Sequence, residues 1–139
     1  MRIGEDPTLG GRLSNTDSRS ANASVGLGYV WSRATGGGSI NSYRFAYGLP
    51  VPPGSSPVRL EGGREEVTLR GQRELSSRAF PSIRFDATAQ DYRHDELDDT
   101  GALQMAFGLR TGTLNMIARQ SAVGPIAEGA WGISTLVKS

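Results

Sequence analysis

The chain has 139 residues, no cysteine and a formal net charge of +1. This length fits a single domain, the lack of cysteine excludes disulfides and thiolate metal sites, and singly scattered arginines argue against a nucleic-acid partner. No run of about 18 apolar residues could form a membrane-spanning helix, and the start MRIGEDPTLG lacks the apolar core of a signal peptide.

The first predicted element is a β-strand from Asn22 to Trp31, because its residues alternate with a period of two. The glycine-rich segment 33–38 predicts a reversal, since glycine adopts positive φ angles at little steric cost. A return strand over 40–47 carries aromatic residues at alternate positions, which completes a predicted hairpin. Four prolines within 48–57 prevent regular strand pairing there.

Two further strands follow the prolines. A long polar strand is predicted from Val58 to about Leu75, and 76–81 forms a short reversal. The next strand has the most regular alternation in the chain, with Ile83 and Phe85 on one side and polar residues on the other. We expect it to end in a polar loop over 91–101.

The remaining chain predicts two more strands. The fifth covers 103–119, and its apolar phase slips between Leu109 and Leu114, which predicts a bulge or a bend near Gly112. A reversal over 121–125 leads to a sixth strand over 130–137. Residues 1–16 are expected to be a loop or disordered.

These elements predict an all-β fold, an antiparallel up-and-down meander of about six long strands. Strands of about 15 to 18 residues rise about 3.3 Å per residue and reach on the order of 50 Å, more than a tilted membrane crossing requires. Membrane strands in which apolar and polar residues alternate are also not detected by a hydropathy search. We therefore expect residues 1–139 to form one domain that is part of a larger transmembrane β-barrel.

Several segments resemble barrel strands of the TonB-dependent outer-membrane receptors. They are residues 13–20, the strand ending Gly28-Tyr-Val-Trp31, and residues 43–50. The most specific is Ile83-Arg-Phe followed by Asp91-Tyr-Arg-His-Asp-Glu-Leu97, which resembles a segment that opens an extracellular loop in that family. The resemblance covers residues 13–138.

The resemblance implies a bacterial outer-membrane protein whose parent is a barrel of about 22 strands closed by a plug domain. Such receptors take up nutrients such as siderophore-like metal chelates, including iron carriers. The implied partners are outer-membrane lipid, the rest of the barrel and its plug, and TonB through that plug. The sequence contains neither a plug nor a TonB-binding segment, so this chain is expected to be a fragment that does not transport alone.

Residues near His94 are the only candidates for a polar site. The loop expected there offers extracellular contacts from Tyr92, His94, Asp95 and Glu96. A metal site would need further converging ligands, so a solvated loop is the simpler interpretation. No Ser-His-Asp or paired-carboxylate arrangement can be argued from spacing. We predict no catalytic residue, no metal, no cofactor and no enzyme.

In the barrel interpretation the two sides of the strands have different roles. Lipid would contact the apolar side, which carries Val25, Leu27, Tyr29, Trp31, Val67, Leu69, Ile83 and Phe85. The polar side would line the lumen, with Arg70, Gln72 and Arg84. Trp31 and Phe80 lie beside short turns, as in interfacial aromatic belts.

The alternative is a soluble small β-barrel or sandwich that binds a ligand. It predicts that the same apolar side chains are buried in one shared core, whereas the barrel interpretation predicts that they point outward. A surface adhesin is a third reading, and it would depend on loops at 49–57 and 91–101.

Overall fold

The computed structural model describes residues 2–3, 7–8, 11–12, 15–51 and 54–139. Every regular element in these residues is a β-strand. Three short strands come first: β1 (Arg2–Ile3), β2 (Pro7–Thr8) and β3 (Gly11–Arg12). Six long strands follow: β4 (Ser18–Trp31), β5 (Ala34–Leu49), β6 (Val58–Glu74), β7 (Ser82–Leu97), β8 (Leu103–Gln120) and β9 (Gly129–Lys138).

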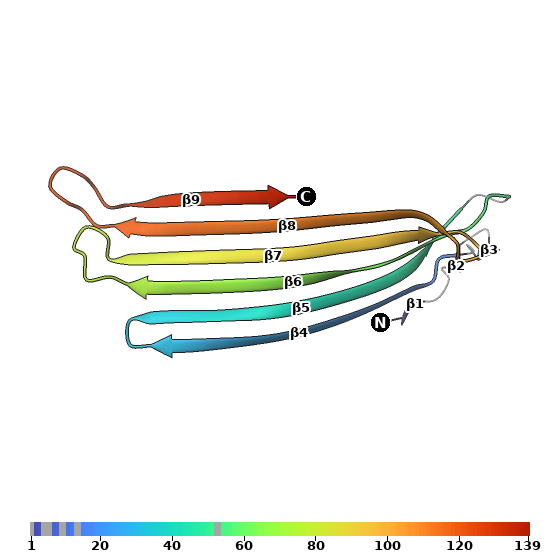
Figure 1. Cartoon of the computed structure of the whole chain (residues 1–139), viewed down its shortest axis with the longest axis horizontal. Coiled ribbons are helices and arrows are strands. Elements are labelled where there is room, and N and C mark those ends of the chain that lie inside the picture. The colour runs from blue at the N-terminus through green and yellow to red at the C-terminus, as the bar shows by residue number, and fades with distance from the viewer. Residues whose placement is uncertain (1, 4–6, 9–10, 13–14, 52–53) are drawn as a thin grey trace. The chain divides into compact units, whose positions relative to one another are not determined.

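The long strands form an antiparallel up-and-down meander. Each pairs with its neighbours in sequence, in the order β1-β4-β5-β6-β7-β8-β9, while β2 and β3 pair separately (Figure 1). Among the described residues β9 has no partner beyond β8, and β4 pairs on its outer side only with β1, so the sheet is not closed into a barrel. The prediction of six long antiparallel strands is confirmed.

The first hairpin corrects the predicted reversal at 33–38. The chain turns within Ser32 and Arg33, and the three glycines Gly36 to Gly38 lie inside β5. A two-residue turn suffices between antiparallel strands. The glycines serve a different purpose, because large side chains of the adjacent strands lie over Gly36 and Gly38.

The predicted loop at 91–101 is also wrong in extent. β7 continues to Leu97, so the segment Asp91 to Leu97 is strand and the turn covers only 98–102. A run of charged residues suggested a loop, but a strand with no second layer over it can be polar on either side. Tyr92, His94, Asp95 and Glu96 therefore lie on a strand.

The bulge predicted near Gly112 is absent from the β8–β9 pairing. The register runs unbroken from Thr111 opposite Lys138 to Gln120 opposite Gly129. The apolar phase of β8 therefore changes without an inserted residue on that side.

For residues 1–16, expected to be loop or disorder, the described part contains β1, β2 and β3. Arg2 and Ile3 pair with Arg19 and Ser18 at the start of β4. Asn15 has a positive φ of 60°, and its side-chain amide donates to the carbonyl oxygens of Leu49 and Val58, each at 2.8 Å.

The chain divides into two units, each built from parts of several strands. The first unit comprises Met1–Ala23, Asn41–Glu65 and Asp91–Leu109, and the second comprises Ser24–Ile40, Glu66–Gln90 and Arg110–Ser139. Within the second unit, the turns that connect β4 to β5, β6 to β7 and β8 to β9 lie at one end of the strands (Figure 1). No helix among the described residues is long and apolar enough to cross a membrane.

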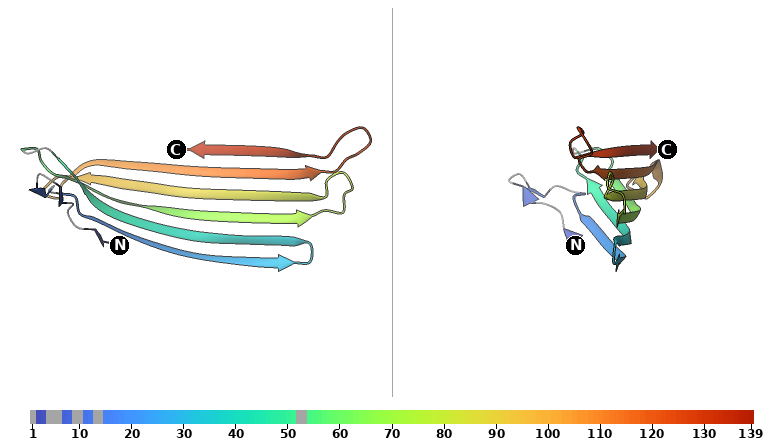
Figure 2. Two further views of the ribbon diagram at one scale, coloured as in Figure 1. Left: turned by 180° about the vertical axis from the view of Figure 1, so that it is seen from behind. Right: turned by 90° about the vertical axis from the view of Figure 1, so that its left-hand side faces the viewer.

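A hydrophobic core is nearly absent. Ala46 (4% exposed) and Leu60 (8%) are the only buried apolar side chains among the described residues. The accessible surface is 10284 Å², whereas a compact folded protein of 14.8 kDa exposes about 7,000 Å². Figure 2 shows no second layer over either side of the second unit. Backbone hydrogen bonds and local side-chain contacts must therefore hold the sheet together.

Glycines covered by a large side chain of the next strand provide such contacts. A Cβ atom placed on Gly38 would lie 2.8 Å from Leu69 Cδ2, and one on Gly71 would overlap the Phe85 ring. A Cβ atom on Gly36 would lie 3.4 Å from the Trp31 ring. Large side chains that fold over glycine pack apolar atoms against backbone and help to fix strand register.

Gly62 offers a test of these close approaches. A Cβ atom there would overlap the carbonyl oxygen of Arg93 and lie 2.7 Å from His94 Cβ. Gly62→Ala should therefore lower the free energy of unfolding by about 1 to 3 kcal/mol, because backbone must move. Gly112 has nothing within 4 Å of a placed Cβ, so Gly112→Ala should leave stability equal or slightly higher. Urea unfolding followed by circular dichroism measures both, and equal losses would contradict the packing argument.

Candidate functional site

The second unit carries an exposed apolar surface. Leu27 is 85% exposed, and Val25, Tyr29, Trp31, Val67, Leu69 and Phe85 are exposed as well, while Ile83 is half-buried. The eight residues predicted to contact lipid thus share no core. This is the arrangement that the barrel interpretation predicts and the soluble alternative does not.

Contacts between adjacent strands place these residues on one side of the sheet. Trp31 of β4 lies over Gly36, Leu69 of β6 lies over Gly38, and Phe85 of β7 lies over Gly71. Because alternate residues of a strand share a side, the other apolar residues follow these three. We call this surface the apolar face, and it comprises Val25, Leu27, Tyr29, Trp31, Val67, Leu69, Ile83 and Phe85.

β8 and β9 show the same division into an apolar and a polar side. Their register sets Met116 opposite Ile133 and Leu114 opposite Thr135, with Trp131 opposite Ala118. The other side carries a hydrogen bond from Ser134 Oγ to Asn115 Oδ1. Trp131 (66% exposed) lies near the turn that precedes β9, as Trp31 lies beside the first turn and Phe80 lies within the second.

The opposite side of the apolar face is polar and ion-paired. Asp86 accepts from Arg84 Nε at 3.0 Å and lies 3.4 Å from Arg70 Nε. With Gln72 these residues line an open groove of about 530 Å³, which Gly28, Gly36, Gly37 and Gly71 also line. The structure thus brings together the three residues predicted to line a lumen, Arg70, Gln72 and Arg84. The sequence reasoning missed the carboxylate that joins the two arginines.

An aromatic cluster occupies one side of the first unit. The Phe45 and Tyr92 rings stack with centroids 6.3 Å apart, and His94 stacks on Phe107 at 5.2 Å. Tyr92 also meets His94 at 5.6 Å. His94 is largely covered, its Nδ1 has no hydrogen-bond partner among the described residues, and its Nε2 lies 4.0 Å from Glu96 Oε1. We call Phe45, Tyr92, His94 and Phe107 the aromatic cluster.

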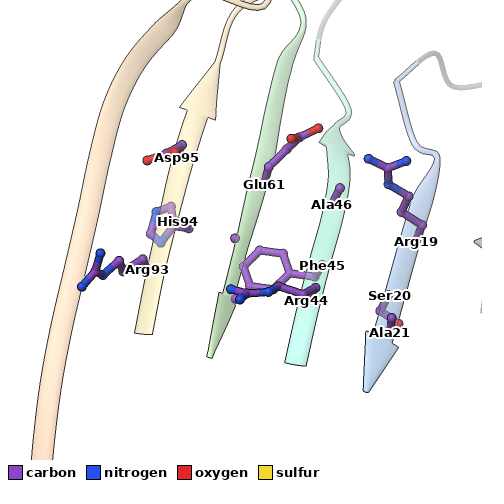
Figure 3. A pocket seen from close by; sticks show the side chains of 12 residues that line it. Arg19, Ser20, Ala21, Arg44, Phe45, Ala46, Glu61, Arg93, His94 and Asp95 are labelled. Atoms are coloured by element: carbon purple, nitrogen blue, oxygen red, sulfur yellow. The ribbon is translucent and has the colours of Figure 1, made fainter. Parts of the chain in front are cut away.

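A second groove, of about 590 Å³, lies wholly in the first unit (Figure 3). Its base contains small residues, Ala21, Ala46 and Gly63, and charged side chains surround it. Arg44 is paired with Glu65 at 2.7 Å and Arg93 with Asp91 at 2.9 Å, so most of the positive charge is already compensated.

The structure separates the four residues predicted as loop contacts. Tyr92 and His94 belong to the aromatic cluster, and Glu96 faces His94. Asp95, one residue away, lines the first-unit groove, which His94 also borders. The sequence reasoning missed Phe107 as the ring partner of His94 and Phe45 as the ring partner of Tyr92, although the alternation of aromatics around Phe45 marked its side of the strand.

The turn after β7 is built around one carboxylate. Asp98 accepts hydrogen bonds from the backbone N–H groups of Thr100 and Ala102, from Thr100 Oγ1 at 2.7 Å, and from Gln104 Nε2. Gly101 adopts a φ of 81°, which favours glycine. The Thr100 hydroxyl first, and then the backbone donors, lower the pKa of Asp98. Among the described residues no group of three or more His, Asp or Glu could hold a metal ion.

The Asp98 turn should respond to pH. Because the folded-state pKa is lowered, its stabilisation is present above the ordinary pKa of an aspartate and is lost as pH falls through the folded value, below about pH 4. The protection factors of the Thr100 and Ala102 amides, that is, exchange relative to the intrinsic rate at each pH, should fall below that pH, and Asp98→Asn should lower them already at neutral pH. Asp99→Asn is the control, since Asp99 makes no hydrogen bond within the described chain. Protection factors that change neither with pH nor with Asp98→Asn would contradict this role.

Comparison with known proteins identifies no relative of this chain. No protein-family model matches the chain, and no curated protein matches it.

Proposed function

We propose that this chain is part of a transmembrane β-barrel of the bacterial outer membrane, with the apolar face against lipid. The observation that carries the proposal is the exposed apolar face on a sheet whose opposite side is polar and ion-paired. Such a division between lipid and water is what a membrane barrel requires. A soluble sheet would have to cover these side chains with a second layer.

The apolar face on β4 covers a large part of a lipid-facing band. It runs from Val25 to Trp31, six rises of about 3.3 Å or about 20 Å along the strand. At a strand tilt of about 40°, this length covers about 15 Å of the band, which is about 25 Å tall in outer-membrane barrels. Trp31, Phe80 and Trp131 lie at or near turns, where the aromatic belt of such a band is found.

The class of barrel rests on the sequence resemblance. The segments around Ile83 and Asp91 to Leu97 resemble TonB-dependent receptors, so we propose a receptor that takes up metal chelates or similar nutrients. In this proposal the aromatic cluster and the first-unit groove face the aqueous side. Transport would need further strands and a plug, so this chain alone would not transport.

Tryptophan fluorescence tests the proposal directly, because Trp31 and Trp131 are the two tryptophans. In vesicles with brominated acyl chains, we expect strong quenching of the emission and protection from aqueous iodide. A folded monomer that stays in solution without detergent, with iodide-accessible tryptophans, would overturn the proposal in favour of a soluble binding module.

A charge on the apolar face should prevent insertion. Leu27→Arg places a guanidinium among exposed apolar side chains, and such a charge costs about 2 to 4 kcal/mol near the middle of a bilayer. The vesicle-bound fraction should therefore fall by at least tenfold, as vesicle flotation would measure. Ser24→Arg is the matched control on the polar side of the same strand and should bind almost as the wild type does. Equal loss in both variants would indicate misfolding, and no loss in either would contradict the assignment.

A further inference from the structure

Buried polar atoms without a hydrogen-bond partner concentrate in the first unit. Among the described residues there are three such side-chain atoms, and they belong to that unit: Asn41 Oδ1, Arg64 Nε and His94 Nδ1. Such atoms are uncommon in folded proteins, because a buried donor or acceptor that has lost water costs free energy until it finds a partner. The first unit is therefore the part of the chain in which a further binding surface is expected.

Arg64 and His94 lie on the same side of the sheet. A Cβ atom placed on Gly62 would lie 2.7 Å from His94 Cβ, whereas one placed on Gly63 would lie 2.8 Å from Arg44 Cδ. Alternate residues of a strand share a side, so Arg64 lies on the side of Gly62. The side that carries Arg64 is therefore the side of the aromatic cluster, to which His94 belongs, and Arg44 is on the other side.

The contacts of the two glycines also fix the strand register around Arg64. In the antiparallel β5–β6 pair they set Arg64 opposite Tyr43, and in the β6–β7 pair they set it opposite Tyr92. The hydrogen bond from Ser42 Oγ to Glu65 Oε1 agrees with this alignment of β5 and β6. Opposite residues have Cβ atoms about 4.5 to 5.5 Å apart, so the guanidinium is within reach of both tyrosine side chains.

Arg64 is a cation without a partner. Its guanidinium makes no hydrogen bond or ion pair among the described residues. Arg59, Arg84 and Arg93, in contrast, each bond a carboxylate two residues away on the same strand. The Nε atom of Arg64 is buried, but its Nη atoms are not among the buried atoms and are accessible to solvent. A free guanidinium can donate two parallel hydrogen bonds to one carboxylate.

Aromatic rings lie next to this cation. The Phe45 ring is 5.8 Å from Tyr43, 5.7 Å from Tyr47 and 6.3 Å from Tyr92, measured between centroids, and is inclined to them by 33°, 31° and 19°. Tyr47 is 36% exposed, so this group of rings is open to solvent. A planar aromatic molecule can stack against rings arranged in this way.

We propose that this side of the first unit binds an aromatic carboxylate. The ligand's ring stacks on the rings around Phe45, and its carboxylate accepts hydrogen bonds from the Arg64 Nη atoms. An aliphatic anion would leave the rings uncovered, and a neutral aromatic molecule would leave the guanidinium unpaired. Glu96 Oε1, 4.0 Å from His94 Nε2, makes the other end of the cluster negative and so directs the carboxylate to Arg64. The inference goes beyond the proposed function and does not depend on insertion of the second unit into lipid.

Equilibrium dialysis of the full chain against 2-naphthoate, in detergent micelles with a protein-free blank, tests the chemistry of the ligand. We expect saturable binding of this probe. The alcohol 2-naphthalenemethanol has the same rings without the charge and should bind at least about tenfold more weakly. Cyclohexanecarboxylate has the charge without the aromatic ring, and its affinity, measured by displacement of 2-naphthoate, should also be at least about tenfold weaker. Equal affinity for either analogue, or no saturable binding, would overturn the proposal.

Arg64→Gln separates this site from a general effect of charge. The variant should weaken 2-naphthoate binding by at least about tenfold, while its circular dichroism stays unchanged because Arg64 has no partner to lose. Arg19→Gln is the matched control and should bind as the wild type does, because Arg19 also has no side-chain partner among the described residues but lies in the first-unit groove with Arg44 (Figure 3). Equal weakening in both variants, or none in Arg64→Gln, would contradict the assignment.

Chemical labelling of the unmutated chain covers the case in which Arg64→Gln does not fold. Phenylglyoxal modifies accessible guanidinium groups, and mass spectrometry of the digested chain gives the rate at each arginine. With 2-naphthoate at about ten times its Kd, modification of Arg64 should slow about tenfold, because only the unbound fraction reacts. The rate at Arg19 should not change. An Arg64 rate that is insensitive to 2-naphthoate would defeat the proposal.

Discussion

A single-layer sheet has no second layer of secondary structure to cover its sides, and the other features of the structure follow from this constraint. Only Ala46 and Leu60 are buried apolar side chains among the described residues. In most domains a second layer supplies the apolar contact that stabilises a sheet. Here no described residue covers the apolar face of the second unit, and in the proposed barrel lipid acyl chains cover it.

The glycine content has a structural explanation in this setting. At 19 residues glycine is about twice as frequent as usual, and several glycines lie mid-strand, where they normally weaken a strand. In this sheet Leu69, Phe85 and Trp31 fold over glycines of neighbouring strands. Each such pair moves an apolar surface onto backbone, so a single layer gains packing that a flat row of β-branched residues could not provide.

The sequence predicted the strands better than their ends. Alternation located β6, β8 and β9 to within a residue or two at most of their bounds. It failed at Gly36 to Gly38, because three consecutive glycines usually indicate a turn. That large side chains of the adjacent strands cover Gly36 and Gly38 follows only from the strand pairing. It failed again at Asp91 to Leu97, because a run of charged residues usually indicates a loop. An exposed strand, however, can carry charged side chains on either side.

The candidate sites were predictable in part for a similar reason. The side of each strand follows from parity alone, so the sequence already separated the exposed apolar residues from Arg70, Gln72 and Arg84, while their contact with lipid and with a lumen stays a prediction. The pairing of His94 with Phe107 was not, because it depends on the register between β7 and β8. Asp86 is one of the polar residues that alternate with Ile83 and Phe85, but its contacts with two arginines follow only from the distances.

The strands also change polarity along their length, which explains the apparent phase slip in β8. Along β7 the odd positions are apolar as far as Ala89 and charged from Asp91 to Asp95, while the even positions change from polar to aromatic at Tyr92. In the proposed barrel, lipid contact must end where the charges begin. Beyond that point the charged side chains of β7 can lie in water, so the proposed lipid contact is confined to the second unit.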